Sequence, residues 1–193
     1  MCRIRWLDFR EWDQPWQDLS TESMRLLLKS KPMTKWDRRF CELAKFVSEW
    51  SKDPNAKVGA VLVSKRGGDV SIGYNGFPMG VEDSVERLQN KKLKLELIVH
   101  AEQNAIIAAG SRSEGATLYV WGKPICARCA GSIIQAGVKR IVALSPESVE
   151  KKSKWHKTGQ YALQMFAEAG VEVDFYVLVD GKSVAGPRSA QTK

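Results

Sequence analysis

The sequence is poor in cysteine and histidine, with four cysteines and two histidines among 193 residues. Cys2 and Cys41 are isolated, whereas Cys126 and Cys129 form a C-x-x-C pair. A small secreted domain held together by disulfides carries a denser framework of cysteines, so this pattern excludes that class. The pattern favours a reducing compartment in which the C-x-x-C pair binds a metal or acts in redox chemistry.

Long hydrophobic runs are also missing. No apolar run approaches the roughly 20 residues that a membrane-spanning helix requires. Residues 1–10 lack the apolar core of a signal peptide. We therefore expect a cytoplasmic protein with no membrane partner. The hydrophobic content of 44% and the charged content of 27% are typical of one globular domain with a substantial core.

Acidic residues are fewer than basic ones, 22 against 30, which gives a net charge of +8. Such an excess favours an anionic partner, either nucleic acid or a phosphorylated metabolite. The alternative is a basic surface that serves only solubility.

The spacing of apolar residues predicts an alternation of helices and strands. A helix is expected over 34–51 and a β-hairpin over 58–64 and 70–74, and the charged segment 81–97 is expected to be a solvated helix or loop. Further helices are predicted over 99–109, from the C-x-x-C pair to about 136 and over 158–169, with strands over 116–121, 139–144 and 171–179. This order predicts a single α/β sheet with helices on both faces.

The domain organisation follows from the same pattern. Residues 33–179 are expected to form the domain, residues 1–32 an N-terminal extension of unknown role, and residues 180–193 a flexible C-terminal tail.

Two short segments carry the chemistry, His100-Ala101-Glu102 and Cys126-Ala127-Arg128-Cys129. One imidazole and two thiols suit zinc and leave a fourth position for water, as a catalytic zinc requires. The Glu102 carboxylate is then the natural proton carrier. Residues i and i+2 inside a helix do not share a face. His100 and Glu102 can therefore reach the same metal site only if they stand at the N-terminus of a helix. The C-x-x-C pair is expected to begin a second helix, whose dipole lowers thiol pKa values.

Two other interpretations of the cysteines remain open. A redox pair leaves the His-x-Glu segment without a role. A structural zinc requires a fourth protein ligand, for which Cys2, Cys41 and His156 are the candidates, and none of these forms a ligand-like pair.

His-x-Glu followed by C-x-x-C is the signature of the zinc-dependent deaminases. Flanking segments narrow the resemblance, and from about Thr34 to Val179 the chain resembles deoxycytidylate (dCMP) deaminases of the phage and bacterial type. The segments that carry it are Ser51-Lys52-Asp53-Pro54, Val58-Gly59-Ala60, Gly73 to Pro78 with Gly80 and Asp83, and His100 to Ile106. Family members usually have proline directly before the first cysteine, whereas Ile125 stands between Pro124 and Cys126 here.

The resemblance implies a three-layer α-β-α cytidine-deaminase-like fold with a five-stranded mixed sheet. It also implies one Zn²⁺ held by His100, Cys126 and Cys129, with Glu102 as the catalytic acid and base. A second, structural zinc, which some phage relatives bind, is not expected, because residues 75–99 contain neither His nor Cys. The implied reaction is hydrolysis of dCMP to dUMP and ammonia, and the dUMP feeds dTMP synthesis. Asn75 would hold the sugar 3′-hydroxyl, and the main chain at Ala101 and near Pro124 would orient the base.

Family members are regulated by deoxynucleoside triphosphates with Mg²⁺, dCTP activating and dTTP inhibiting, and they assemble as hexamers. The resemblance therefore implies a homo-hexamer. The positions that match the effector site are Asn75, Gly76, Phe77, Gly80, Glu82, Asp83 and Asn104. The substrate phosphate requires cationic donors, and the basic residues of segments 51–57 and 151–157 are candidates.

Two rival functions remain open, one enzymatic and one non-catalytic. A deaminase acting on tRNA adenosine or on single-stranded DNA cytidine fits the net charge of +8. A non-catalytic, zinc-stabilised module could bind nucleic acid through the tryptophans of residues 1–32. The Gly73-Tyr74-Asn75-Gly76 loop and Asn104 favour a free nucleotide over a nucleic-acid partner.

Overall fold

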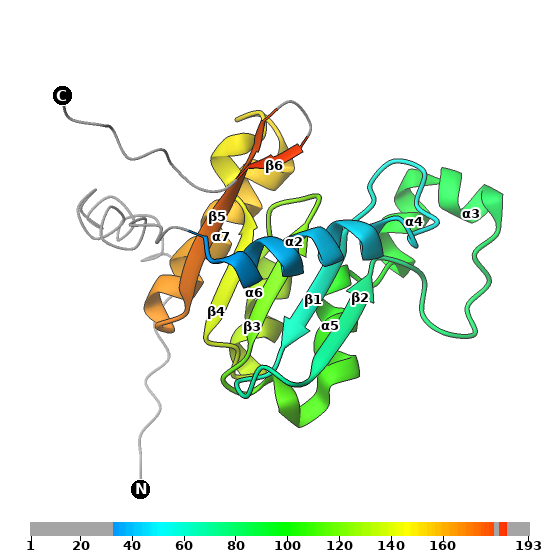
Figure 1. Ribbon diagram of the computed structural model, residues 1–193. Coiled ribbons are helices and arrows are strands. Elements are labelled where there is room, and N and C mark those ends of the chain that lie inside the picture. Colours follow the sequence, from blue (N-terminus) through cyan, green and yellow to red (C-terminus); the bar gives the residue numbers. More distant parts are fainter. Residues whose placement is uncertain (1–32, 180–181, 185–193) are drawn as a thin grey trace, which may run out of the picture.

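The computed structural model describes residues 33–179 and 182–184 (Figure 1). The predicted N-terminal extension, residues 1–32, lies outside the described residues, as does most of the predicted tail. In the described part of the chain, no helix has the length and apolarity needed to cross a bilayer.

One mixed sheet runs through the domain in the order β2-β1-β3-β4-β5-β6. β1 pairs antiparallel with β2 and β3, whereas β3, β4 and β5 are parallel. The strands are β1 (Gly59–Val63), β2 (Val70–Tyr74), β3 (Thr117–Trp121), β4 (Arg140–Leu144), β5 (Glu172–Val179) and β6 (Lys182–Val184). The predicted five-stranded mixed sheet is confirmed. The structure adds β6, a three-residue strand at the edge, where the sequence predicts only a tail.

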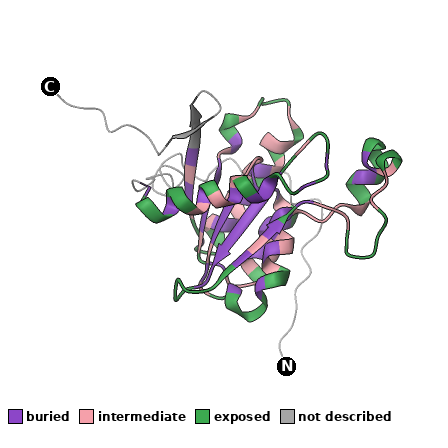
Figure 2. Cartoon of the chain, turned by 45° about the vertical axis from the view of Figure 1, so that its right-hand side comes forward, coloured by how far each residue is buried: buried purple, intermediate pink, exposed green. Residues whose placement is uncertain are grey.

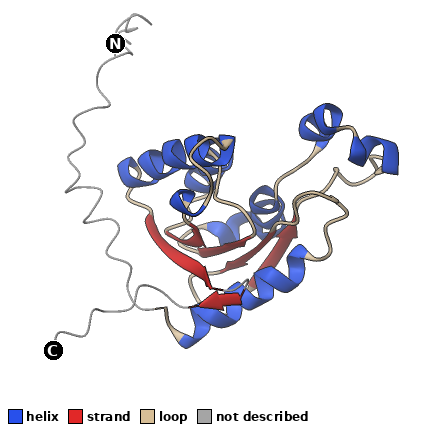
Figure 3. Cartoon of the chain, turned by 90° about the horizontal axis from the view of Figure 1, so that it is seen from above, coloured by secondary structure: helices blue, strands red, loops and turns tan. Residues whose placement is uncertain are grey.

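Helices cover both faces of the sheet, which confirms the three-layer α-β-α prediction. Helix α2 (Lys35–Ser48) packs on one face, against β1 and β3. Helices α5 (Ala101–Ala109), α6 (Ala127–Gln135) and α7 (Lys154–Glu168) cover the other face (Figure 3). Figure 2 shows the central strands buried between these layers, and every residue of β1 is buried.

The N-terminus of α2 is fixed to the sheet by a buried carboxylate. Thr34 caps the helix and forms a capping box with Asp37. The same carboxylate accepts hydrogen bonds from the hydroxyl of Tyr119 at 2.8 Å and from Arg140 at 2.7 Å. Burial alone raises the pKa of Asp37, but hydrogen bonds from Arg140, Thr34 and Tyr119 outweigh it and hold the pKa well below its usual range.

The charged segment before His100 forms two short helices, α3 (Val85–Gln89) and α4 (Lys91–Leu97). They lie to one side of the three layers (Figures 1 and 3). The prediction of a solvated helix or loop is wrong in one respect, because Lys94 is buried. The physical reason is an ion pair with Asp53, 41 residues away in the chain.

Candidate active site

His100 is placed by the start of α5 and by a short backbone bridge. It is the N-cap residue of the helix, and its side chain makes no capping hydrogen bond, so the imidazole is available to other groups. Gly76, just past the end of β2, and Val99 exchange two backbone hydrogen bonds of 3.1 and 2.9 Å. This bridge returns the chain from α3 and α4 to the end of β2 and places His100 there.

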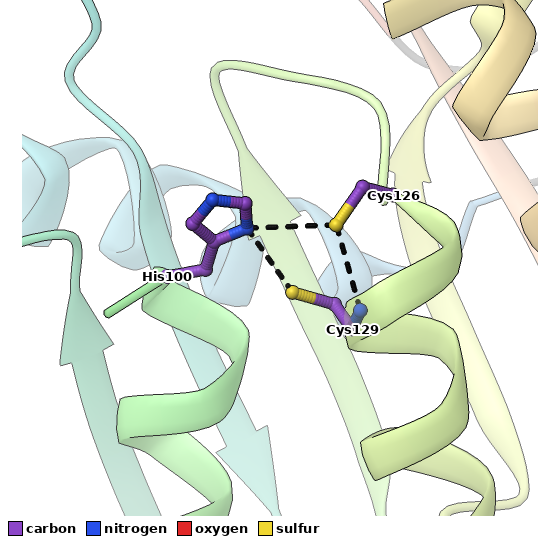
Figure 4. Close-up of side chains that lie close together, drawn as sticks. All are labelled: His100, Cys126 and Cys129. Atoms are coloured by element: carbon purple, nitrogen blue, oxygen red, sulfur yellow. Dashed lines mark hydrogen bonds between the residues drawn. The ribbon is translucent and has the colours of Figure 1, made fainter. Parts of the chain in front are cut away.

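The two cysteines come from the next β–α connection. Cys126 is the N-cap residue of α6, which follows β3, and its sulfur accepts a hydrogen bond from the Cys129 amide at 3.5 Å. Nδ1 of His100 lies 3.2 Å from the sulfur of Cys129 and 3.5 Å from that of Cys126 (Figure 4). The structure therefore confirms that both segments open helices, and it brings the three side chains together.

These three side chains fit a zinc ion. A nitrogen and a sulfur that bind one tetrahedral zinc ion at the usual distances lie about 3.6 Å apart. The distances from Nδ1 of His100 to the two sulfurs, 3.2 and 3.5 Å, are close to this value. Hydrogen bonds from Cys129 and then from His100 lower the pKa of Cys126 to about 4, which favours the thiolate form that binds metal.

The ligand set favours a catalytic zinc over a structural one. Among the described residues, the group with metal-ligand geometry consists of His100, Cys126 and Cys129 alone. Of the candidates for a fourth ligand, Cys41 lies in the core on the opposite face of the sheet, and His156 faces Glu147 at 3.3 Å. Cys2 lies outside the described residues. A three-ligand site leaves one coordination position for water.

Glu102 lies in the first turn of α5 and lines the same cleft as His100. The start of the helix accommodates the i, i+2 spacing of the two residues, as the sequence predicts. Glu102 is only 4% exposed, and desolvation raises the pKa of its carboxyl group. A carboxyl group with a raised pKa exchanges protons more readily near neutral pH, which suits general acid–base chemistry.

The site opens into a cleft of about 500 Å³, a volume that suits a small-molecule ligand. Its lining includes His100, Ala101 and Glu102 at the start of α5, Pro124 and Trp155, and residues of α4. The Trp155 ring centre lies 6.0 Å from that of His100. Periodicity places the α7 helix from residue 158, four residues late, so the sequence gives little sign that Trp155 borders the site.

Asn75 lies in the wall of the cleft and is buried. Its side-chain oxygen accepts a hydrogen bond from the Val58 amide, and its side-chain nitrogen donates one to the Ala56 carbonyl, each at 2.8 Å. The Ser51 hydroxyl donates to the backbone carbonyl of Asn75, also at 2.8 Å. The side chain thus braces the loop before β1, a role that sequence analysis does not predict.

Most of the predicted effector positions lie away from the cleft. Apart from Asn75, none of Gly76, Phe77, Gly80, Glu82, Asp83 and Asn104 is among the described residues that line it. Asn104 donates a hydrogen bond to the Tyr74 carbonyl at 2.8 Å, and Asp83 pairs with Lys52 at 2.7 Å. These contacts tie the loop after β2 to its neighbours.

A buried ion pair in the cleft wall has no counterpart in the sequence prediction. Lys94 of α4 and Asp53 lie 2.7 Å apart, and both side chains are almost fully buried. The same Asp53 oxygen accepts backbone hydrogen bonds from Asn55 at 2.8 Å and Ala56 at 3.2 Å. The pair therefore joins α4 to the loop that Asn75 braces.

Replacing Lys94 with methionine is expected to destabilise the fold by about 3–5 kcal/mol, because the Asp53 charge stays buried without its partner. Denaturant unfolding measures the loss, and Lys92→Met, at an exposed position of the same helix, is the matched control. The double variant Asp53→Asn/Lys94→Met is expected to recover part of the stability. A Lys94→Met protein as stable as the control shows that the pair does not hold the wall.

The start of α5 lies directly on β2 at Gly73. A Cβ atom at this position would overlap the Ala101 carbonyl oxygen and the Ala105 amide nitrogen. Both are backbone atoms of the helix that carries His100 and Glu102, so no side chain can rotate away to make room. The absence of a side chain at Gly73 sets the depth of the active-site helix.

We expect Gly73→Ala to cost about 1–3 kcal/mol of stability through overpacking and to weaken zinc binding by moving His100. The control is Gly68→Ala, because a Cβ there meets no atom within 4 Å. Thermal unfolding and zinc content per chain are the measurements. If Gly73→Ala matches the control in both, the helix position does not depend on this contact.

Comparison with known proteins agrees with this geometry. Residues 34–145 match the model of the cytidine and deoxycytidylate deaminase zinc-binding region. An uncharacterized deaminase from Aliivibrio fischeri is 40% identical over 147 residues, which are 76% of this chain and 97% of that protein. The deoxycytidylate deaminase of Homo sapiens is 38% identical over 144 residues, 70% of this chain and 76% of that protein.

Solved structures give the same relationship. The apo dCMP deaminase of cyanophage S-TIM5 matches with a TM-score of 0.55 and 26% identity, covering 74% of this chain and 99% of that one. The same enzyme in complex with dCMP and dUMP matches with a TM-score of 0.55 and 25% identity, covering 74% and 98%. Residues 34–145, which match the family model, include His100, Glu102, Cys126 and Cys129. This chain therefore belongs to the cytidine and deoxycytidylate deaminase family.

Proposed function

We propose that this protein is a dCMP deaminase, which converts dCMP and water to dUMP and ammonia. The observation that carries the proposal is a His100-Cys126-Cys129 site with the buried Glu102 beside it, at the end of a cleft large enough for a nucleotide. The human relative is named a deoxycytidylate deaminase, and the cyanophage relative was solved with dCMP and dUMP. These relatives support dCMP over other cytosine substrates.

Each residue of the site has a separate role in the proposed deamination. His100, Cys126 and Cys129 would hold a zinc ion, which would lower the pKa of water toward about 7. Glu102 takes one proton from the water that attacks C4 of the pyrimidine and passes it to N3. It then takes the proton of the new C4 hydroxyl group and passes it to the amino group, which leaves as ammonia. Ala101 and Pro124 line the cleft beside His100, where their main-chain groups are expected to orient the base. Asn75 lies in the wall as the proposed partner of the sugar 3′-hydroxyl.

Ammonia release tests the proposal. The wild-type protein is expected to release ammonia from dCMP and not from single-stranded DNA or tRNA. Deamination of either polymer, but not of dCMP, supports the rival polynucleotide deaminase, which the net charge of +8 favours. Binding of nucleic acid without any ammonia release supports the non-catalytic module instead.

Regulation and assembly are a finer part of the proposal. We expect activation by dCTP and inhibition by dTTP with Mg²⁺, a homo-hexamer, and a cytoplasmic location in which dUMP feeds dTMP synthesis. The loop from Asn75 to Asp83, together with Asn104, is the proposed effector site. Asn104 donates a hydrogen bond to the carbonyl of Tyr74, the residue before this loop, which supports the grouping. Velocity curves for dCMP with each triphosphate, and the mass in solution from light scattering, test these expectations.

A further inference from the structure

The cleft carries an uneven set of charges. Four lysines line it, Lys91, Lys94, Lys123 and Lys154, against two carboxylates, Asp53 and Glu102. Lys94 and Asp53 neutralise each other in their buried pair. Glu102 lies in the first turn of α5, two residues after His100. Three lysines therefore remain in the lining of the cleft, against Glu102 alone.

The three remaining lysines come from separate parts of the chain. Lys91 begins α4, Lys123 precedes Cys126 in the loop after β3, and Lys154 begins α7. Neither Lys91 nor Lys123 forms an ion pair with any residue that the structure describes. The Lys154 ammonium lies 5.3 Å from the ring centre of Trp155, another residue of the cleft. The fold thus collects cations around one opening, although no local sequence pattern links them.

The other basic residues that the sequence suggests as phosphate ligands either form ion pairs or lie outside the lining of the cleft. Lys52 pairs with Asp83, and Lys57 pairs with Glu49. Lys151, Lys152 and Lys157 do not line the cleft among the described residues. Of the segments 51–57 and 151–157, only Lys154 therefore offers a cation to a ligand in the cleft.

We propose that Lys91, Lys123 and Lys154 form the subsite that binds the 5′-phosphate of the nucleotide substrate. This inference rests on the proposed function, because the cytosine ring must lie beside His100 and Glu102 for deamination. The sugar and phosphate then extend along the cleft toward the lysines. A phosphate carries three strong acceptor oxygens, which suit three ammonium groups that line one cleft. The Lys94–Asp53 pair supports the subsite by fixing the helix that carries Lys91.

The subsite gives the enzyme its preference for a nucleotide over a nucleoside. Deoxycytidine has the same base and sugar as dCMP but nothing to place against the lysines. Each charge-assisted hydrogen bond is worth about one to two factors of ten in affinity when buried and less when solvated. Loss of one lysine is therefore expected to raise KM for dCMP roughly five- to ten-fold, with little effect on deoxycytidine.

The experiment compares kcat and KM for dCMP and for deoxycytidine in Lys91→Gln, Lys123→Gln, Lys154→Gln and the triple variant. Lys92→Gln and Lys152→Gln are the controls, since both lysines are exposed neighbours that do not line the cleft. Added salt is expected to raise KM for dCMP in the wild type and to have little effect on the triple variant, because screening acts on the charges that were removed.

The outcomes separate the two proposals. Selective loss of dCMP binding in the cleft variants, with unchanged controls and an unchanged kcat/KM for deoxycytidine, supports the subsite. If wild-type protein deaminates dCMP but the cleft variants match the controls, or lose both substrates equally, the subsite is wrong and the proposed function stands. Wild-type protein that does not deaminate dCMP overturns the proposed function and the subsite with it.

Discussion

Glu102→Gln is expected to keep its zinc and to lose turnover of dCMP by about 10²–10⁴-fold, the usual contribution of a general acid–base group. Glutamine has nearly the same shape as glutamate and fits the same buried position in the first turn of α5. It cannot accept a proton from water or deliver one to N3. The loss is therefore expected in kcat, with KM for dCMP changed little.

Zinc content per chain and single-turnover ammonia release measure the two halves of this expectation. Glu168→Gln makes the same chemical change at an exposed position near the end of α7, and it serves as the control. Near-wild-type ammonia release from Glu102→Gln contradicts the assignment of Glu102. Loss of zinc together with turnover assigns this carboxylate to metal binding instead.

The candidate metal ligands can be predicted from the sequence because two of them are close together in the chain. The C-x-x-C spacing and the start of a helix fix the relative positions of Cys126 and Cys129. Only the meeting of that pair with His100 depends on the fold, and the order of strands and helices already implies it. The strand–helix connections place both helix starts at one end of the sheet, and the Gly76–Val99 bridge completes the arrangement.

The walls of the cleft are not predictable in this way. Lys94 stands in a charged, lysine-rich segment, and exposure is the usual state of lysine. Its burial depends on Asp53, 41 residues earlier in the chain, and no periodicity records that contact. The bracing role of Asn75 likewise depends on partners 17 and 19 residues away. Contacts between loops that are distant in the sequence produce no periodic pattern of residues, so one sequence alone does not reveal them.

The same limit applies on the opposite face of the sheet. Asp37 appears in the sequence as an ordinary first-turn acid of a helix, which helix capping explains. Its further partners are Tyr119 and Arg140, 82 and 103 residues away. Arg140 also bonds Asp174 on β5. The sequence thus predicts the layers and the metal site, whereas the polar contacts that hold the layers in place require the structure.

Cys129→Ala is expected to abolish stable zinc binding and, with it, turnover of dCMP. Cys129 is fully buried in the first turn of α6, and its sulfur lies 3.2 Å from Nδ1 of His100. A two-ligand remnant of His100 and Cys126 cannot complete a tetrahedral zinc site with a single open position. Because metal binding to the folded state adds to its stability, the variant is also expected to unfold at a lower temperature than zinc-loaded wild type.

Cys41→Ala is the matched control, since Cys41 is also a buried free cysteine but lies in the core on the opposite face of the sheet. It is expected to retain one zinc per chain and full turnover, even if the small cavity lowers its melting temperature. Elemental analysis and thermal unfolding with and without a chelator distinguish the two effects. The chelator should lower the melting temperature of wild type and Cys41→Ala and leave that of Cys129→Ala unchanged. Retention of tightly bound zinc by Cys129→Ala contradicts the three-ligand site, because the ion then depends on other residues.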